Sequence, residues 1–383
     1  MRQRRSYQLA RVAGIRIGAG PSWFIVLFLL IWWLAEYFDA ILVDSQTTVY
    51  VVAVAGAFGY FLSLVLHELG HAMVARRLGI PIAGIDLWFF GGLSRMRREP
   101  ATAGEEFKIA AAGPAVTLLL LAACVAAGSL IGGSHRFTDV ALTKEHFTTS
   151  PALALVGWLG FVNAFLFVFN IIPAFPLDGG RIARAAIWAR TGDRNRATQA
   201  TGRAGQALAI GLGALGLLTY GSSRSLLDLL TLFLAFVLFQ AASGAVLQGR
   251  IGRRIQGLRV GDIMDREPVT IPTGTSLVDA NEQFFLRYRW PWFVVVDQGR
   301  HFLGVVREQR VEEEIAGGRP ALRVEDVLES DLPVQITEEA PLESLLGAEG
   351  LGRLGAMVAV DGEGVLQGVV TIAQVRRALA PAT

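Results

Sequence analysis

Two histidines and a glutamate lie together in the stretch SLVLHELGHAMVARRLG, which covers Ser63–Gly79. His67 and His71 are four residues apart, so on a helix they share one face and are about one turn apart. Two imidazoles placed in this way can bind one metal ion, and Glu68 between them can act on a water at that ion. The stretch therefore predicts a metal centre. The alternative is a chance HExxH whose histidines only hydrogen-bond their neighbours.

The apolar surroundings of this motif favour the metal interpretation. The chain has 383 residues, of which 52% are hydrophobic, and its mean hydropathy of +0.46 is too high for an ordinary soluble domain. Six apolar segments are long enough, or nearly so, to cross about 30 Å of hydrocarbon, at residues 21–38, 49–78, 107–131, 152–172, 204–220 and 226–247. The motif lies near the end of the second segment, where ionisable groups are costly unless they pair or bind a metal.

The basic residues set the expected orientation. Most arginines before residue 258 precede the first apolar segment or follow the second, fourth and sixth, whereas the opposite loops hold only Arg136, Lys144 and Arg224. By the positive-inside rule both termini are cytoplasmic. The motif then lies in the cytoplasmic third of its segment. The sequence predicts a multi-pass protein of the cell membrane, in contact with the lipid bilayer.

A catalytic zinc usually has three protein ligands and a water, so a third ligand is needed at the same depth. The fourth apolar segment also runs from outside to inside and ends in NIIPAFPLDGG, residues 170–180. Asp178 is expected near the same boundary, where two prolines break the helix and Gly179–Gly180 keep the backbone loose. The alternative use of this aspartate is to N-cap a short helix from Arg181 onward.

Together the motifs resemble the site-2 proteases, a family of intramembrane zinc metalloproteases. The resemblance rests on three motifs, which are HELGH at 67–71, AAGPAVT at 111–117 and NIIPAFPLDGG at 170–180. It implies one zinc ion per chain, with His67, His71 and Asp178 as ligands. It also implies that Glu68 is the catalytic base. Thr117 departs from the family, because many members have Asn there, and this departure concerns local packing.

The polar, glycine-rich residues 79–98 between the second and third segments have two interpretations. They form a plain cytoplasmic loop, or a β-hairpin at membrane depth, where non-helical backbone must be buried in protein or line a cavity. FFGG, which ends in Gly91 and Gly92, resembles the family's membrane-embedded hairpin. An exposed edge there could bind an unwound substrate by strand addition. Asn170 is a further candidate, either for substrate contact or as a cap of the broken helix.

The chain changes character near residue 258. Residues 1–257 contain 23 Lys/Arg and 13 Asp/Glu, whereas residues 258–383 contain 12 and 20. The acidic part holds two similar runs about 64 residues apart, which share the patterns FVVVD/MVAVD and LGVV/QGVV. They resemble a tandem pair of CBS domains, a soluble α/β module, at residues 258–317 and 322–380.

The CBS resemblance implies a regulatory module that typically binds adenine nucleotides. Members that do so often carry Thr/Ser and Asp just after the GVV strand. Here those places hold Arg307 and Arg310 in the first run, and Thr371 and Gln374 in the second. Thr371 is therefore the candidate nucleotide contact. The alternative is a pure docking or dimerisation module, which would give a homodimer.

The resulting expectation is a polytopic α-helical membrane protein with about six transmembrane helices and a membrane-embedded β-hairpin, followed by a soluble tandem CBS module. Residues 1–250 form the predicted protease domain. Its expected substrates are membrane-spanning or membrane-associated regulatory proteins, cut near the cytoplasmic side, and no nucleic-acid partner is expected. The alternatives are a CBS-regulated transporter, whose polar residues would be spread over several spans, and an inactive scaffold, which the intact Glu68 disfavours.

Overall fold

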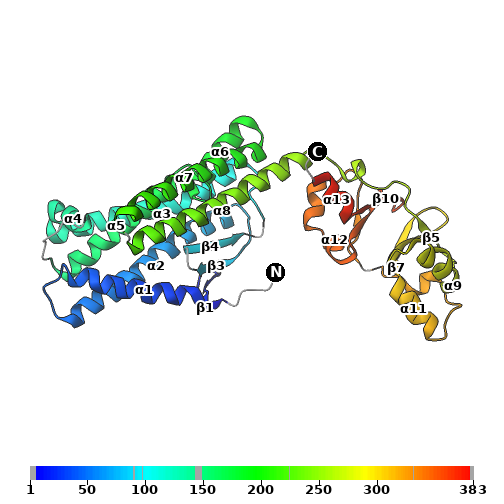
Figure 1. Cartoon of the computed structure of the whole chain (residues 1–383), viewed down its shortest axis with the longest axis horizontal. Helices are drawn as coiled ribbons and strands as arrows, with labels where there is room; N and C mark the ends of the chain where they lie inside the picture. The colour runs from blue at the N-terminus through cyan, green and yellow to red at the C-terminus, as the bar shows by residue number, and fades with distance from the viewer. Residues whose placement is uncertain are drawn as a thin grey trace. The chain divides into compact units, whose positions relative to one another are not determined.

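The computed structural model describes residues 6–88, 91–96, 98–142, 149–223, 225–330 and 332–379 of the chain. The chain divides into two compact units, Met1–Gly249 and Arg250–Thr383 (Figure 1). The sequence places the end of the protease domain at residue 250 and the start of the first CBS domain at residue 258. These domain bounds stay a prediction.

Six helices in the described part of the chain are long and apolar enough to cross a membrane. They are α1 (Pro21–Asp39), α2 (Gln46–Arg77), α3 (Ala103–Gly132), α5 (Pro151–Ile171), α7 (Arg194–Ser223) and α8 (Leu226–Ile255). The prediction of six apolar, membrane-length segments is confirmed. The largest difference is at α7, which begins at Arg194 rather than at residue 204, because the polar residues before the apolar run are helical as well.

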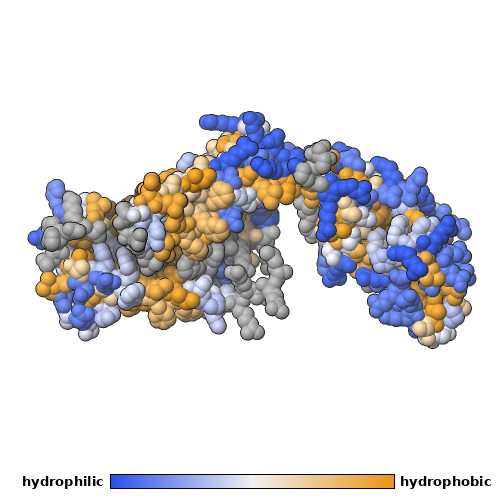
Figure 2. All heavy atoms as spheres, viewed as in Figure 1, coloured by the Kyte–Doolittle hydropathy of each residue, from blue (hydrophilic) through white to orange (hydrophobic). Residues whose placement is uncertain are grey.

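The outer faces of these helices carry large apolar side chains. Phe28 and Trp32 on α1 are 67% and 66% exposed, and Leu119 on α3 is 71% exposed. Figure 2 shows hydrophobic residues over much of the visible helical unit and a mostly hydrophilic face on the second unit. Apolar surfaces of this extent are unfavourable in water. The first unit is therefore the multi-pass membrane part of the protein.

Two shorter helices and a sheet complete the first unit. The helices are α4 (Ser134–Ala141) and α6 (Asp178–Thr191). The sheet contains β1 (Tyr7–Val12), β2 (Ile15–Ala19), β3 (Ile82–Trp88) and β4 (Gly91–Met96), hydrogen-bonded in that order. Strands β1 and β2 were not predicted. Strand β2 pairs with β3 in parallel across a long stretch of sequence, with Ile17 opposite Ile85.

Strands β3 and β4 form an antiparallel hairpin within residues 79–98. Gly91 lies opposite Trp88 and Gly92 opposite Leu87. The residues that connect these strands, Phe89 and Phe90, lie outside the described residues. Among the described residues, strand β4 pairs only with β3, so it is an edge of the four-stranded sheet. The depth of this hairpin in the membrane stays a prediction.

The second unit contains two sheets of the same topology. Its strands and helices are β5 (Thr270–Pro272), α9 (Leu277–Ala280), α10 (Leu286–Tyr288), β6 (Trp292–Val296), β7 (Phe302–Arg307), α11 (Glu308–Ala316), β8 (Gln335–Ile336), α12 (Glu349–Leu354), β9 (Ala356–Val360), β10 (Leu366–Thr371) and α13 (Ile372–Leu379). In each sheet a short strand pairs in parallel with a central strand, which pairs antiparallel with a third. Ile251 and Ile255, from the last turns of α8, pack in an apolar core of this unit.

The repeat is also visible in the turns of the two antiparallel hairpins. Asp297 accepts a hydrogen bond from the backbone N–H of His301 at 2.8 Å, and Asp361 accepts one from the N–H of Val365 at 2.9 Å. These backbone bonds favour the charged carboxylate and lower the pKa of both aspartates. Equal turns at equivalent positions show that the two runs are copies of one structural unit.

Candidate metal centre

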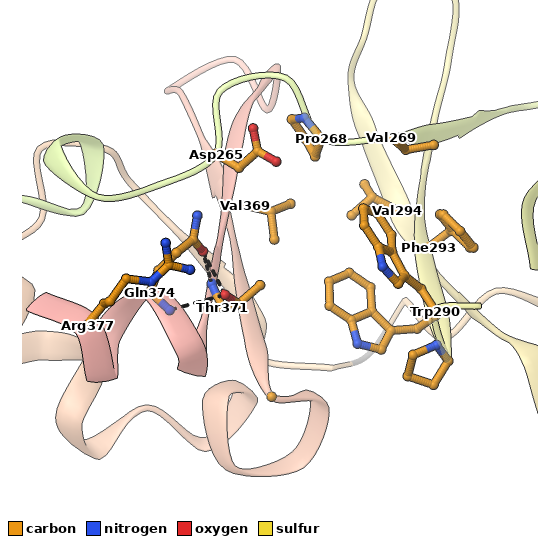
Figure 3. A pocket seen from close by; sticks show the side chains of 13 residues that line it. Asp265, Pro268, Val269, Trp290, Phe293, Val294, Val369, Thr371, Gln374 and Arg377 are labelled. Atoms are coloured by element: carbon orange, nitrogen blue, oxygen red, sulfur yellow. Dashed lines mark hydrogen bonds between the residues drawn. The ribbon is translucent and has the colours of Figure 1, made fainter. Parts of the chain in front are cut away.

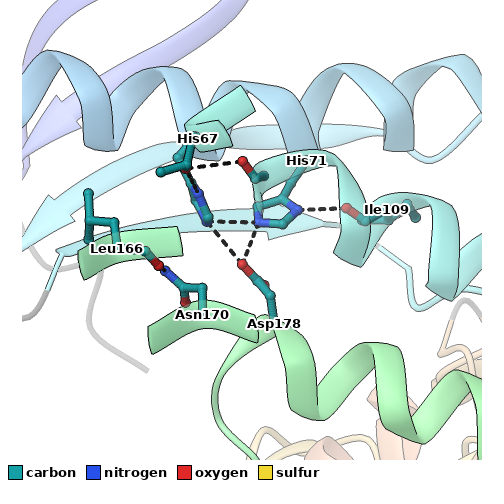
Figure 4. Close-up of polar contacts among 8 residues, drawn as sticks. His67, His71, Ile109, Leu166, Asn170 and Asp178 are labelled. Carbon is teal, nitrogen blue, oxygen red and sulfur yellow. Dashed lines mark hydrogen bonds and ion pairs between the residues drawn. The ribbon is translucent and has the colours of Figure 1, made fainter. Parts of the chain in front are cut away.

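Helix α2 supplies two buried imidazoles to one point. His67 and His71 are 4% and 3% exposed, and their Nε2 atoms lie 3.2 Å apart. One helical turn separates the two residues, so their side chains leave the same face of α2. Figure 4 shows both rings directed towards the short helix that begins at Asp178.

The Asp178 carboxylate completes this cluster. Its Oδ2 lies 3.0 Å from Nε2 of His67 and 3.1 Å from Nε2 of His71. Asp178 is the first residue of α6, and the N-cap position belongs to Leu177, whose side chain makes no capping bond. The N-cap alternative for Asp178 is therefore not what the structure shows. The structure brings together the three predicted ligands, and they are the one group of this kind in the described part of the chain.

The hydrogen bonds at the far side of each ring orient both imidazoles. Nδ1 of His71 lies 2.6 Å from the carbonyl oxygen of Ile109, which only accepts, so this nitrogen carries the hydrogen. Nδ1 of His67 lies 2.8 Å from Oγ1 of Thr117, whose own hydrogen is donated to the carbonyl of Gly113 at 3.2 Å. Both rings therefore present an Nε2 lone pair to Asp178, as metal-binding histidines do.

This arrangement fits a bound cation. Two Nε2 lone pairs and a carboxylate oxygen face one another at about 3 Å, and three acceptors so placed repel unless positive charge lies between them. Nitrogen and carboxylate ligands from three side chains are the usual protein ligands of a catalytic zinc. The residues present therefore suit a zinc ion on their own chemistry.

Gly113 on α3 leaves the space in which the ligands meet. A Cβ built at Gly113 would lie 2.2 Å from Nε2 of His71 and 2.7 Å from Nε2 of His67. Any side chain at this position would displace the rings. Sequence reasoning assigned no role to Gly113 and related Thr117 only to local packing. The only signal for either residue was the motif AAGPAVT, because their contacts depend on how α2 and α3 cross.

Glu68 lies beside the ligand cluster without being part of it. The residue is half-buried, and its carboxylate interacts electrostatically with His71. A carboxylate in this position can exchange protons with a group at the metal centre. The two acidic side chains therefore differ in position: Asp178 lies within the cluster and Glu68 lies beside it.

Helix α6 is held close to the broken end of α5. A Cβ at Gly179 would lie 2.2 Å from the carbonyl oxygen of Ile171, and one at Gly180 would lie 2.5 Å from the carbonyl carbon of Ala174. Both glycines are helical, so they permit close backbone approach rather than a loose backbone. The two residues after Asp178 thus allow α6 to start against the end of α5.

The other predicted substrate contacts lie near this cluster or on the sheet. Nδ2 of Asn170 donates to the carbonyl of Leu166 at 3.0 Å, within the last turns of α5. Figure 4 shows Asn170 on the segment next to Asp178. Gly91 and Gly92 lie at the start of the edge strand β4. None of these three residues belongs to the ligand cluster.

The second unit contains a cavity of about 380 Å³. It is lined by residues of both CBS repeats, among them Asp265, Trp290, Val294, Thr371 and Arg377 (Figure 3). The predicted contact Thr371 does line this cavity, while Oε1 of Gln374 accepts from the N–H and the hydroxyl of Thr371 at 2.7 and 2.8 Å.

The equivalent positions in the first repeat are occupied by ion pairs. Arg307 contacts Glu329 at 3.1 Å, and Arg310 contacts Glu314 at 3.1 Å. Neither arginine is among the residues that line the cavity. The two CBS repeats thus differ where nucleotide-binding members carry their polar ligand contacts.

Known proteins resemble the chain along almost its whole length. The model of peptidase family M50 matches residues 55–212, and the CBS domain model matches residues 260–317. "Putative zinc metalloprotease Rip3" of Mycobacterium tuberculosis is 31% identical over 382 residues, covering 98% of this chain and 93% of that protein. "Zinc metalloprotease MJ0392" of Methanocaldococcus jannaschii is 28% identical over 322 residues, covering 83% of each.

One solved structure belongs with these relatives. It is the site-2 protease from Methanocaldococcus jannaschii, which aligns at 26% identity and a TM-score of 0.40, covering 63% of this chain and 95% of its own. The family assignment itself rests on sequence identity over nearly the full chain. With HELGH and Asp178 inside the matched segment, this chain belongs to peptidase family M50, the site-2 protease family of zinc metalloproteases.

Proposed function

We propose that the chain cleaves membrane proteins at a single zinc ion held by His67, His71 and Asp178. The observation that carries this proposal is the convergence of two Nε2 lone pairs and one carboxylate oxygen within about 3 Å, with both Nδ1 atoms bonded elsewhere. Family membership makes the chain a zinc metalloprotease rather than the transporter considered as an alternative.

Glu68 performs the proton transfers in this proposal. A zinc ion held by His67, His71 and Asp178 would supply a Lewis acid and would lower the pKa of an attacking water. The Glu68 carboxylate takes a proton from that water as its oxygen bonds to the carbonyl carbon. Glu68 then delivers the proton to the leaving nitrogen as the peptide C–N bond breaks. Thr117 and Ile109 hold the two imidazoles in the required orientation through the hydrogen bonds at Nδ1.

The direct test compares the intact chain with its Glu68→Gln variant. A membrane-spanning protein is co-expressed with each, and the zinc content and the cleavage of the substrate are both measured. Comparison of the membrane proteomes of cells that carry either form would then identify uncleaved partners, which accumulate only with the variant.

The substrate in this proposal is a membrane-spanning or membrane-associated regulatory protein that pairs with strand β4. Strand β4 is an edge of the sheet, and an edge offers unpaired backbone groups to an extended segment. Gly91 and Gly92 lie on this edge and have no side chains that could obstruct an approaching chain. Asn170, next to Asp178, is the proposed polar contact to the substrate backbone (Figure 4).

Both termini and the CBS pair are proposed to be cytoplasmic. The support is the distribution of arginines around the six helices. The cluster at His67, His71 and Asp178 then lies towards the cytoplasmic side, because α2 and α5 both run from outside to inside.

Cysteine labelling tests this orientation. In a chain whose one cysteine, Cys124, is replaced by alanine, single cysteines are placed at His135, Gly221, Thr191 and Gln298, all exposed. A membrane-impermeant maleimide added to intact cells should label the cysteines at His135 and Gly221. It should label those at Thr191 and Gln298 only after the cells are opened. Labelling of the cysteine at Gln298 in intact cells would reverse the proposed orientation.

The CBS pair is proposed to bind an adenine nucleotide in its cavity. The support is the size of the cavity and its lining, in which Trp290 offers an aromatic face, Arg377 a cation and Thr371 a hydroxyl group. A homodimer formed through the CBS pair stays a prediction. The CBS domains are proposed to span residues 258–317 and 322–380.

Calorimetry on the purified full chain with ATP, ADP and AMP tests this site. One or more of the three is expected to bind, and Trp290→Ala should weaken binding by about 5–150-fold, since stacking of a base on an aromatic ring contributes on the order of 1–3 kcal/mol. Arg353→Ala is the matched control, because Arg353 pairs with Glu349 away from the cavity. Absence of binding at millimolar nucleotide would leave a docking role for the pair.

A further inference from the structure

We infer that the buried ion pair between Glu106 and Arg184 positions Asp178 for metal binding, an inference that rests on the proposed metal site. Glu106 lies in the first turn of α3 and its side chain is fully buried, while the Arg184 side chain on α6 is 13% exposed. Nε of Arg184 donates to Oε1 of Glu106 at 2.8 Å, and Nη2 donates to the same oxygen. The pair joins α3, which contacts the two histidines, to α6, which carries Asp178.

Glu106 lies on the same face of α3 as the residues that touch the histidines. Ile109, Gly113 and Thr117 follow it at spacings of three or four residues, which place all four on one stripe of the helix. Along this stripe, Glu106 binds α6, and the other three contact His67 or His71. A single face of α3 thus contacts the two imidazoles and the anchor of α6.

Helix α6 packs against α3 and α7 mainly through small or half-buried side chains. It follows the break at the end of α5, and its buried residues are Asp178, Gly179, Gly180 and Ala185. Beyond the first turn, therefore, the small side chain of Ala185 is its one fully buried apolar group. Arg184 lies next to it, six residues from Asp178 and in the middle of α6, so an anchor at Arg184 holds the half of the helix that carries the proposed ligand.

The geometry of the pair favours a positioning role over a stabilising one. Both contacts from Arg184 go to Oε1, while Oε2 of Glu106 is buried without a hydrogen-bond partner in the described part of the chain. Removing two charges from water is costly, and a pair with an unsatisfied oxygen recovers that cost poorly. A charged pair is nevertheless directional, so it favours one placement of α6 on α3 more specifically than apolar packing does.

Loss of the pair therefore frees α6 to shift on α3. Its N-terminal carboxylate is then no longer held at 3.0 and 3.1 Å from the two Nε2 atoms. Groups outside the ligand set that orient ligands typically change metal affinity by about 10–100-fold when they are lost. We expect a decrease of this size for Glu106→Gln and for Arg184→Met.

The test measures metal binding by the purified full chain in detergent. Zinc affinity is obtained by competition with a chelator, and Co²⁺ replaces zinc for absorption spectra, because the visible bands of Co²⁺ report its ligands directly. The variants are Glu106→Gln, Arg184→Met and the double variant Glu106→Met with Arg184→Met. The matched control is Glu105→Gln. Glu105 is in the same turn but accepts from the N–H of Ala101 at 2.8 Å and does not contact α6.

The double variant separates positioning from charge balance. It leaves no unpaired charge, so its thermal unfolding should remain close to that of the intact chain, yet its zinc affinity and Co²⁺ spectrum should change as in the single variants. Glu105→Gln should match the intact chain in all measurements. Zinc affinity and Co²⁺ spectra equal to those of the intact chain in the single variants, or restored in the double variant, would overturn the inference. Failure of the intact chain to bind zinc would instead contradict the proposed metal site.

Discussion

The Glu68→Gln variant is expected to hydrolyse a membrane substrate about 10²–10⁴-fold more slowly than the intact chain, while keeping its zinc. Glutamine preserves the size and hydrogen bonds of this half-buried side chain but cannot accept the proton of the attacking water. Glu68 is not one of the three clustered ligands, so the metal site is unchanged. The measurement is zinc per chain by elemental mass spectrometry, beside cleavage of a co-expressed membrane substrate.

A matched control removes a glutamate elsewhere in the membrane unit. Glu99 pairs with Arg194 at 2.6 Å, and its side chain is 63% exposed, so Glu99→Gln should change neither zinc content nor cleavage. If Glu68→Gln cleaved at the rate of the intact chain, then HELGH would not be the hydrolytic centre. If the variant lost its zinc, then Glu68 would belong to the ligands, and the separation of roles between the two acids would be wrong.

Asp178→Ala is expected to lose zinc and cleavage together. Its Oδ2 lies close to both Nε2 atoms, and its removal leaves two imidazoles from a single helix as ligands. The loss of affinity should exceed the roughly 10–100-fold that follows from losing a partner outside the ligand set. Zinc per chain and cleavage are measured as for Glu68→Gln. The contrast between the two variants is the decisive result, because Glu68→Gln should lose hydrolysis but keep zinc, whereas Asp178→Ala should lose both.

The control for Asp178→Ala is another aspartate at the start of a helix. Asp193 accepts a hydrogen bond from the N–H of Arg196 at 2.8 Å just before α7. Asp193→Ala should therefore remove a helix cap that contributes about 1 kcal/mol to stability, and it should leave zinc bound. Full zinc and full activity in Asp178→Ala would mean that another group completes the site. In that case the convergence of Asp178 on the histidines would be a hydrogen-bonding arrangement rather than a set of ligands.

The convergence of His67, His71 and Asp178 could be predicted because its information is local. His67 and His71 need only the helical period to share a face, and the placement of Asp178 followed from matching the ends of two apolar segments that are predicted to run in the same direction. The groups that orient the rings were not predictable in the same way. Thr117 and the carbonyl of Ile109 act through the crossing of α2 and α3, and no spacing within either helix reveals which residues meet at that crossing.

The limits of prediction in the fold have a similar cause. The six apolar segments could be located because burial in lipid requires length and hydrophobicity, which are properties of one segment at a time. Strands β1 and β2 were missed, because β2 joins the sheet through parallel pairing with β3, more than 60 residues away. The repeat of the second unit was found because two runs could be compared with each other, and Asp297 and Asp361 occupy the same turn in both.

Position 113 cannot accept a substitution without moving the two histidine rings, because it requires a residue with no side chain. Every residue that a single-base change can place there carries a Cβ, and a Cβ would fall 2.2 Å from Nε2 of His71. Even alanine, the next larger residue, carries this Cβ, whereas surface positions on the same helix can accept larger residues. Among chains that keep HExxH and the distant aspartate, the residue at this place on the third helix therefore offers a simple criterion for separating working hydrolases from relatives that have kept the fold and lost the chemistry.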